Sequence, residues 1–301
     1  MEKIEGSIIR KLKLPRTDSH KGENGRLLVI AGNEMYFEAL LYAIRAASRI
    51  VDLVYVLTTR ENRKLVEKLK SKTAEFMLVH NAPFTPSYLK RGDGELSFDC
   101  VLIGPGMGKS KRTYQLVERV LKSGIKAVLD ADALNVLDAE LLKCLNGNHI
   151  LTPHTRKFAR LLQPPLNLPL SASTRQGEKK GGHLPLGEGE KRRAVQNFAK
   201  KYGCSIVLKG KVDIVAGPDG RISENYTGNE GMTKGGTGDV LAGLIAAFYC
   251  RSDAFTSAAA GVYLNGVAGD ELYKRVGPIY NSEDLVEQIP RTLWRHVKLK
   301  S

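Results

Sequence analysis

Residues 229–243 read N-E-G-M-T-K-G-G-T-G-D-V-L-A-G, a glycine-rich loop that runs directly into an apolar segment with helical spacing. Gly235, Gly236 and Gly238 allow positive φ and let backbone N–H groups converge at a helix start, where the helix dipole favours negative charge. Asp239 lies beside this predicted anion site. A carboxylate there can accept a proton from a hydroxyl while the N–H groups hold the phosphoryl group that the hydroxyl attacks. An acidic helix cap after a flexible turn would give the same short pattern.

This loop differs from the two common phosphate-binding loops. A Walker A loop has Lys and then Ser or Thr after its last glycine, whereas a dinucleotide fingerprint has G-x-G-x-x-G between a strand and a helix early in a βαβ unit. Here Gly236 is followed by Thr237, and the loop stands near the end of the chain. The sequence therefore predicts an anion site of another kind.

Composition is typical of a soluble enzyme, with 42% hydrophobic and 26% charged residues among 301. We expect one domain over residues 1–301. No apolar run approaches the ~20 residues that cross a bilayer, so we expect no membrane span, and we expect no signal peptide. We expect the protein to be cytoplasmic. The four cysteines are widely spaced, which favours reduced core thiols over disulfides or a metal site.

The formal net charge of +14 suits a polyanionic ligand such as a nucleotide, or nucleic acid itself. The basic residues stand in short clusters at 179–180, 191–193 and 298–300, without interleaved aromatic residues. This pattern favours a solvated face, and we do not expect nucleic acid as a partner.

Short apolar runs alternate with helix-patterned segments along most of the chain, which predicts an α/β fold with a mostly parallel sheet covered on both faces. We expect strands at 26–32, 53–59, 75–79, 100–104, 127–130, 149–152 and 205–209, and a hairpin of 212–216 with 221–225. Helices are expected at 37–50, 61–70, 111–123, 139–145, 155–162, 192–202, 240–249, 254–274 and 282–297, with a turn or short helix at 86–91. Residues 163–190 have no periodicity and are rich in Pro, Gly and Ser, which predicts a mobile surface loop or lid.

Polar residues collect where three predicted strands end. They are G-P-G-M-G at 104–108, D-A-D-A-L-N at 130–135 and T-P-H at 152–154. Each alone could be a tight turn, a helix cap or an ordinary loop histidine. Ligands of parallel sheets bind at the carboxyl ends of the strands, so three such segments at one edge predict a pocket.

Together these segments resemble the NAD(P)H-hydrate dehydratase family of the ribokinase-like superfamily. The matching text is K-G-E-N-G-R-L-L-V-I-A-G (21–32), I-G-P-G-M-G (103–108), L-D-A-D-A-L-N (129–135), L-T-P-H (151–154) with F-A-R-L-L (158–162), V-L-K-G-K (207–211) and T-G-N-E-G-M-T-K-G-G-T-G-D-V-L-A-G-L (227–244). In this order they cover nearly the whole chain, and the last is the most specific. The resemblance implies a three-layer α/β/α fold.

The resemblance also implies a reaction and its residues. A nucleotide, ADP or ATP with Mg²⁺, would phosphorylate the ring hydroxyl of hydrated NADH or NADPH, and elimination of phosphate would restore NAD(P)H. Asp239 would be the base, with the N–H groups around Gly236 and Gly238 as the anion hole. The implied substrate-binding residues are Ala39, Gly106, Asp132, Asn135, His154 and Asp239; the nucleotide-binding residues are Lys209, Gly210, Lys211, Val212, Asp213, Thr237 and Gly238. No metal ligand is assigned. We expect a homo-oligomer, such as a tetramer.

The chain departs from the family's usual pattern at several places: Asn33 and Glu38 stand where the family has a serine and a glycine, and the loop at 163–190 is longer than usual. Two further departures concern charged or polar positions of the expected site. Lys157 stands where the family has an acidic residue near magnesium, and Asn265 replaces a histidine common in the penultimate helix. Lys157 could neutralise phosphate charge directly, or it could simply point to solvent. Two alternatives remain open on sequence: a kinase of a small alcohol, such as a sugar or vitamin precursor, and a nucleotide- or RNA-binding relative without catalysis.

Overall fold

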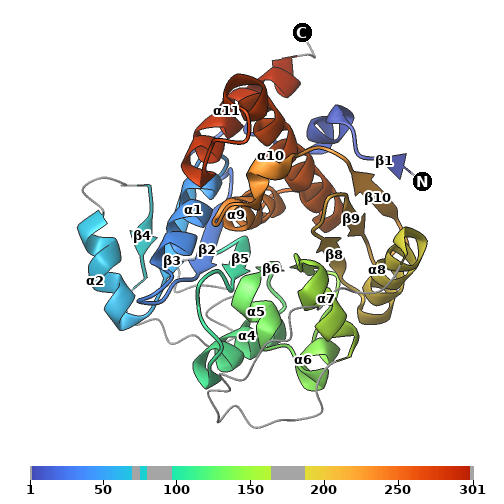
Figure 1. Cartoon of the computed structure of the whole chain (residues 1–301). Helices are drawn as coiled ribbons and strands as arrows, with labels where there is room; N and C mark the ends of the chain where they lie inside the picture. Colours follow the sequence, from blue (N-terminus) through green and yellow to red (C-terminus); the bar gives the residue numbers. More distant parts are fainter. Residues whose placement is uncertain (1, 70–74, 80–96, 164–186, 299–301) are drawn as a thin grey trace.

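The computed structural model describes residues 2–69, 75–79, 97–163 and 187–298. Their strands form one ten-stranded sheet in the order β1-β10-β9-β8-β7-β6-β5-β2-β3-β4 (Figure 1). The strands are β1 (Glu2–Lys3), β2 (Arg26–Ile30), β3 (Leu53–Leu57), β4 (Met77–Leu78), β5 (Cys100–Ile103), β6 (Ala127–Leu129), β7 (His149–Leu151), β8 (Ser205–Leu208), β9 (Asp213–Ala216) and β10 (Ile222–Asn225).

The sheet is parallel from β8 through β4, and β9 pairs antiparallel with both β8 and β10. The central parallel strands are buried on both faces, as crossover connections require, whereas the edge strand β4 is partly exposed. The described helices are η1 (Gly6–Lys11), α1 (Phe37–Ala47), α2 (Arg60–Leu69), α4 (Lys111–Ser123), α5 (Ala131–Asn135), α6 (Ala139–Lys143), α7 (Thr155–Leu162), α8 (Glu188–Tyr202), η2 (Glu230–Thr233), α9 (Thr237–Tyr249), α10 (Ala254–Val276) and α11 (Ser282–Lys298).

Two hydrophobic cores lie on opposite faces of the sheet. One joins the sheet to α1, α9, α10 and α11, and the other joins it to α4 through α8. This is the predicted three-layer α/β/α arrangement. Among the described helices, none combines the length and the apolar character that a bilayer crossing needs.

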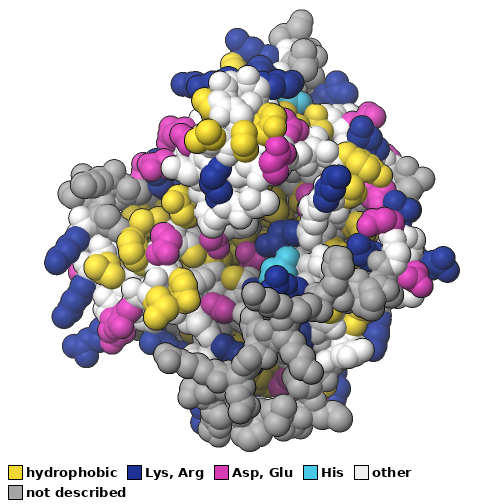
Figure 2. Space-filling view, in the orientation of Figure 1, with side chains coloured by type: hydrophobic (Ala, Val, Ile, Leu, Met, Phe, Trp, Pro, Cys, Tyr) yellow, Lys and Arg dark blue, Asp and Glu magenta, His cyan; other side chains and the backbone are white. Residues whose placement is uncertain are grey.

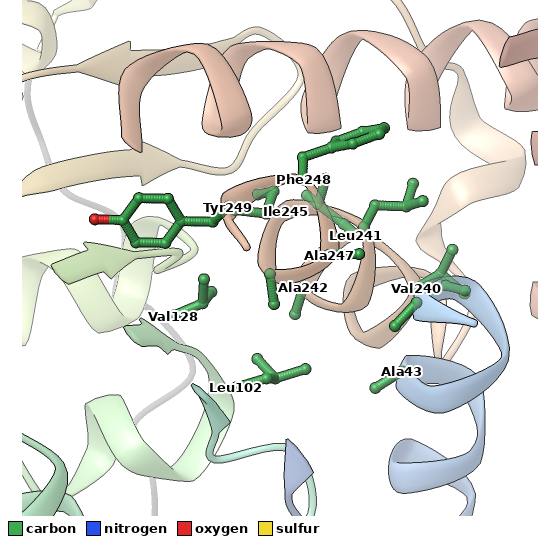
Figure 3. Packing of buried hydrophobic residues seen from close by; sticks show 14 of the residues in the cluster. Ala43, Leu102, Val128, Val240, Leu241, Ala242, Ile245, Ala247, Phe248 and Tyr249 are labelled. Carbon is green, nitrogen blue, oxygen red and sulfur yellow. The ribbon is translucent and has the colours of Figure 1, made fainter. Parts of the chain in front are cut away.

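Helix α9 lies at the centre of the first core. Its residues from Val240 to Tyr249 are all buried, so it packs against other elements on every side. Figure 3 shows Ala242 toward Leu102 and Val128 of the sheet, with Phe248 on the opposite side of the helix. A Cβ at Gly243 would lie 2.4 Å from the Ala43 carbonyl oxygen of α1, so glycine is needed for this close approach. The buried helix fixes the position of the glycine loop that precedes it.

The structure corrects several predicted boundaries. Helix α8 begins at Glu188, not at 192, because the Gly187 amide donates to Glu190 Oε2 over 2.8 Å and caps the helix inside the predicted loop. Helix α9 begins at Thr237, not Val240. The short helix α5 and the N-terminal strand β1 were not predicted. Residues 164–186, the rest of the predicted loop, and the turn expected at 86–91 lie outside the described residues.

Candidate active site

The glycine loop places the N-terminus of α9 at the carboxyl edge of the sheet. Gly236 is the N-cap with φ of 91°, and a Cβ there would lie 2.6 Å from the Tyr42 ring and 2.8 Å from Ser282 Oγ. Ser282 Oγ donates to the Gly235 carbonyl over 2.7 Å, which ties the loop to α11. The first N–H groups of a helix have no acceptor within the helix. The Thr237 N–H donates to the Lys234 carbonyl over 3.5 Å, whereas those of Gly238 and Asp239 have no acceptor among the described residues and are available to an anion.

Asp239 lies within the first turn of α9 and is half-buried. No hydrogen bond joins its carboxylate to the part of the chain that the structure describes. Burial raises its pKa to about 7, with a further contribution from the nearby charge of Asp130, while Lys209 and Lys157 act in the opposite direction. A free carboxyl group that titrates near neutral pH is suited to exchange protons with a ligand.

Asp130 and Lys209 form the centre of the charged cluster, and sequence reasoning did not assign Asp130 a role. The Lys209 ammonium lies 2.9 Å from Asp130 Oδ1, which also accepts from Thr152 Oγ1 over 2.8 Å. Burial raises the pKa of Asp130, but Lys209 more than offsets this, and the net pKa is lowered. A Cβ at Gly238 would lie 3.5 Å from Lys209 Nζ. Asp130 therefore holds a cation beside the N-terminus of α9.

His154 and Lys157 border the same cluster from α7. His154 is the N-cap residue, and its backbone pairs with that of Lys209. Partial burial, together with the charges of Lys157 and Lys209, lowers the pKa of His154 to about 4, so its ring is neutral at pH 7.

Lys157 does not point to solvent, as one sequence interpretation had it. Its Nζ donates to the Ala131 carbonyl over 2.6 Å, and burial lowers its pKa. Ala131 has φ of 46°, the one positive φ of a non-glycine residue among the described residues. Such backbone strain is concentrated at functional sites. Lys157 thus secures the turn between Asp130 and Asp132.

Of the predicted substrate residues, Gly106 follows β5 and Asp132 and Asn135 follow β6, whereas Ala39 lies in α1 and His154 follows β7. A Cβ at Gly106 would lie 2.4 Å from the Tyr36 carbonyl and 3.2 Å from Ala39 Cβ, so Gly106 and Ala39 are adjacent. The Asp132 carboxylate accepts from the Gly108 amide and from Asn135 Nδ2, both over 2.8 Å. Asp132, itself bonded to Asn135, therefore ties the loop after β5 to α5.

A cavity of about 680 Å³ opens on the other side of the α9 N-terminus. Its wall carries charged side chains, among them Lys209, Lys211 and Asp213, and apolar ones, among them Met232 and Leu241. Its lining residues are Lys209, Gly210, Lys211, Asp213, Thr227, Gly228, Asn229, Glu230, Met232, Thr233, Thr237, Gly238, Leu241, Val262, Asn265 and Gly266. The volume lies within the range of sites for drug-sized ligands and cofactors.

Six of the seven predicted nucleotide-binding residues line this cavity. Val212 is the exception, since it is not among the described lining residues. The Asp213 carboxylate accepts from the Gly210 amide and from Asn225 Nδ2, so it holds the loop in shape. Thr237 Oγ1 donates to the Met232 carbonyl over 2.7 Å and closes the glycine loop. Sequence reasoning assigned no binding role to the rest of the lining, which comes mainly from residues 227–233 and 262–266, although residues 227–233 belong to the most specific matching segment.

Acidic, basic and histidine side chains gather in the hollowed centre of the face drawn in Figure 2. Within the described residues, no group of three or more His, Cys, Asp or Glu side chains could hold a metal ion by itself. The arrangement can bind an anion at the α9 N-terminus, offer a base at Asp239 and neutralise charge with Lys209.

Comparison with known proteins identifies this arrangement. Residues 27–291 match the family model described as NAD(P)H-hydrate dehydratase. The chain belongs to this family. A dehydratase relative, the ADP-dependent (S)-NAD(P)H-hydrate dehydratase of Cenarchaeum symbiosum, is 31% identical over 291 residues, covering 92% of this chain and 91% of that protein.

Longer dehydratase relatives also match. The bifunctional NAD(P)H-hydrate repair enzyme of Methanocaldococcus jannaschii is 34% identical over 293 residues, which cover 95% of this chain and 51% of that protein. The chain thus spans about half the length of the bifunctional relatives it matches.

Solved structures confirm the ribokinase-like fold. The ADP/ATP-dependent NAD(P)H-hydrate dehydratase of Bacillus subtilis, co-crystallised with ATP and Mg²⁺, superposes with a TM-score of 0.76 at 24% identity, covering 98% of each chain. Dehydratase family membership gives the glycine loop, the sheet edge and the cavity a common context, which an acidic helix cap alone would not explain.

Proposed function

We propose that this protein catalyses the nucleotide-dependent dehydration of the S form of hydrated NADH and NADPH, with ADP as the preferred phosphoryl donor over ATP. The observation that carries the proposal is the environment of the Asp239 carboxyl group. Its carboxyl group is half-buried, has a pKa of about 7 and lies between the cavity and the sheet edge that carries the predicted substrate residues. The family and the ADP-dependent relative support the choice of substrate and nucleotide.

The nucleotide and the hydrated ring would bind to different sets of residues. The nucleotide would lie in the 680 Å³ cavity, with its terminal phosphate at the α9 N-terminus beside Lys209. The hydrated ring would lie at the ends of β5 and β6, near Gly106, Ala39 and His154. Because the two sites meet at Asp239, the ring hydroxyl and the terminal phosphorus can be held for in-line transfer.

The reaction then proceeds in two steps. Asp239 accepts the hydroxyl proton as the hydroxyl oxygen attacks the terminal phosphorus, and the bond from that phosphorus to the departing nucleotide breaks. With ADP the departing nucleotide is AMP. In the second step the lone pair of the ring nitrogen expels phosphate, and a proton passes from the neighbouring ring carbon to that phosphate. The N–H groups at Gly236–Gly238 and Lys209 stabilise the phosphoryl charge in the first step.

The residues present fit a magnesium ion that arrives on the nucleotide phosphates. Asp130 Oδ1 is occupied by Lys209 and Thr152, but no hydrogen bond from the described residues reaches Oδ2. Mg²⁺ at nucleotide sites is typically held by one or two carboxylates together with phosphates, so Asp130 could supply the protein ligand. When bound, the ion would neutralise charge on the transferring phosphoryl group.

The test is to incubate the protein with hydrated NADH, Mg²⁺ and either ADP or ATP, and to follow the absorbance of reduced nicotinamide. We expect a rise that requires nucleotide and is faster with ADP. If absorbance stays constant with both nucleotides while a sugar or a vitamin precursor is phosphorylated, the protein is a kinase and the proposal is wrong. Omitting Mg²⁺ and omitting the hydrate are the matched controls.

The assembly belongs to the proposal as well. We expect a homo-oligomer, and the exposed Ile279 and Trp294, 83% and 57% accessible, are the first residues to examine for contacts between copies. Sedimentation at working concentration tests this. A place in the cytoplasm remains a prediction.

A further inference from the structure

Asn265 of α10 is a buried amide that makes no hydrogen bond within the described chain. It is only 4% exposed, and its Oδ1 has no partner. Three other described residues carry a buried polar atom of this kind, namely Asn62, His149 and Ser205, but Asn265 alone among them lines the 680 Å³ cavity. An unpaired buried amide end costs about 1–3 kcal/mol, so this position is destabilising unless a ligand completes it.

Neighbouring polar groups are already occupied and cannot satisfy Asn265. Thr227 Oγ1 donates to Asn225 Oδ1 over 2.8 Å, and Asn225 Nδ2 donates to Asp213 and to the Val262 carbonyl. A Cβ at Gly266 would lie 2.1 Å from Thr227 Oγ1, so α10 is pressed against this network beside Asn265. Packing therefore holds the α10 backbone in place, while the hydrogen-bonding groups of the Asn265 amide are left for a ligand.

The surroundings of Asn265 fit a flat heterocycle. Leu241, Val262 and Met232 supply apolar surface to the cavity that Asn265 lines. Lys209 lies beside Gly238 at the α9 N-terminus, with its Nζ 3.5 Å from the position of a Gly238 Cβ. A nucleotide with its phosphates at Lys209 would extend its base toward Asn265. This orientation rests on the nucleotide site proposed above.

We propose that Asn265 recognises the amino edge of adenine and so selects adenine nucleotides over guanine and hypoxanthine nucleotides. An asparagine amide offers one acceptor and one donor side by side, which matches the N6 amine and N7 of adenine. Guanine and hypoxanthine present two acceptors, O6 and N7, on that edge and leave the amide oxygen unpaired. Because neither end of the Asn265 amide bonds to the described protein, the amide can turn to present both groups.

The experiment measures binding of ADP, IDP and GDP by calorimetry, without substrate, for the wild type, Asn265→Leu and Asn265→Ala. We expect the wild type to prefer ADP over IDP and GDP by about tenfold to a hundredfold, the usual worth of a bidentate base contact. Asn265→Leu keeps the size of the side chain and should bring the ADP to IDP ratio close to one, mainly by weakening ADP. If Asn265→Leu does not fold, the ADP to IDP ratio is measured with Asn265→Ala instead.

Ser205→Ala is the matched control, because it also removes a buried unpaired polar atom but lies away from the cavity, in β8. It should keep the wild-type ratio. Equal affinity of the wild type for ADP, IDP and GDP would overturn the role of Asn265 and leave the proposed function standing, as would an unchanged ratio in both Asn265 variants. If no nucleoside diphosphate binds, the proposed function fails together with this inference.

Discussion

Neutralising the carboxylate of Asp239 should stabilise the free protein while abolishing turnover. Burial holds the pKa of this group at about 7, against an ordinary value of 3.8. Asp239→Asn keeps the shape of the side chain but cannot ionise. We expect turnover to fall about a hundredfold to ten-thousandfold, the range for a positioned general base, and the melting temperature at pH 8 to rise.

The size of the effect follows from the two pKa values. They differ by about 3 pH units, and each unit corresponds to about 1.4 kcal/mol. The folded protein binds the Asp239 proton more tightly than the unfolded chain does, so folding stability falls as the pH rises from about 4 to about 7. The asparagine variant avoids this loss. Its advantage should be below about 1 kcal/mol at pH 4 and about 4 kcal/mol at pH 8, or about 8 °C at ~2 °C per kcal/mol.

Thermal unfolding of both proteins at several pH values between 5 and 8 tests this reasoning. Asp253→Asn is the control of opposite sign. Burial raises the pKa of Asp253, but its bond from the Thr256 amide, 3.0 Å long, more than offsets this, and the net pKa is lowered. Asp253 therefore contributes stability above pH 4 that is lost as the pH falls. A melting difference for Asp239→Asn that does not grow with pH, or near-normal turnover, would refute the assignment of Asp239 as a buried base.

Two further predictions concern the sheet edge. Lys157→Ala should weaken nucleotide binding more than binding of the hydrate, and Lys157→Glu should make turnover more dependent on magnesium. The reason is that the Lys157 cation lies in the electrostatic field of Asp130 and Asp239. Superimposable magnesium titrations of turnover for the wild type and both variants would show that Lys157 takes no part in phosphate handling. Gly104→Ala should be far more destabilising than Gly124→Ala: both glycines have positive φ, but a Cβ at Gly104 would lie 1.9 Å from the Asp130 carbonyl, while Gly124 has no atom within 4 Å of a Cβ. Similar melting temperatures for these two variants would contradict the clash.

The layers of the fold and the location of the site could be predicted from local patterns. Apolar runs separated by amphipathic segments indicate parallel strands with crossover helices, and the polar ends of such strands must meet at one edge. This is why Asp132, His154 and Asp239 were expected together, and the structure places all three at that edge. The role of the glycines in the loop before α9 could also be predicted, because few other residues adopt backbone conformations with positive φ.

The division of roles between Asp130 and Asp132 could not be predicted. The two aspartates stand two positions apart in one motif, and sequence favoured Asp132. In the structure Asp132 is occupied by Gly108 and Asn135, whereas Asp130 pairs with Lys209, which lies 79 positions further along the chain. That pairing depends on β6, β7 and β8 being neighbours in the sheet, which is a property of the topology and not of the motif.

The cavity could also be predicted from the sequence only in part. The part expected to hold the phosphates is built from the glycine loop and the segment after β8, and both contain recognisable motifs. Its other end is formed where α10 contacts the loop after β10, through the close approach of Gly266 to Thr227. The loop after β10 belongs to the matching segment 227–244, but nothing in its residues or in those of α10 indicates that the two meet around a ligand. The buried amide of Asn265 can be identified as a candidate ligand contact only in the folded structure, because tertiary packing determines which donors and acceptors lie near it.

The cluster also explains how one site can both hold the phosphate and supply the base for the proposed phosphoryl transfer. Asp130 fixes Lys209 beside Gly238 before any ligand arrives, so the cation needs no rearrangement when phosphate enters. Burial raises the pKa of Asp239, and the negative charge of Asp130 raises it further, which keeps that carboxyl group basic enough to accept a proton at neutral pH. Asp130 thus acts on the phosphate through Lys209 and on the base through space. A single carboxylate at the end of β6 therefore couples the anion site to the proton acceptor.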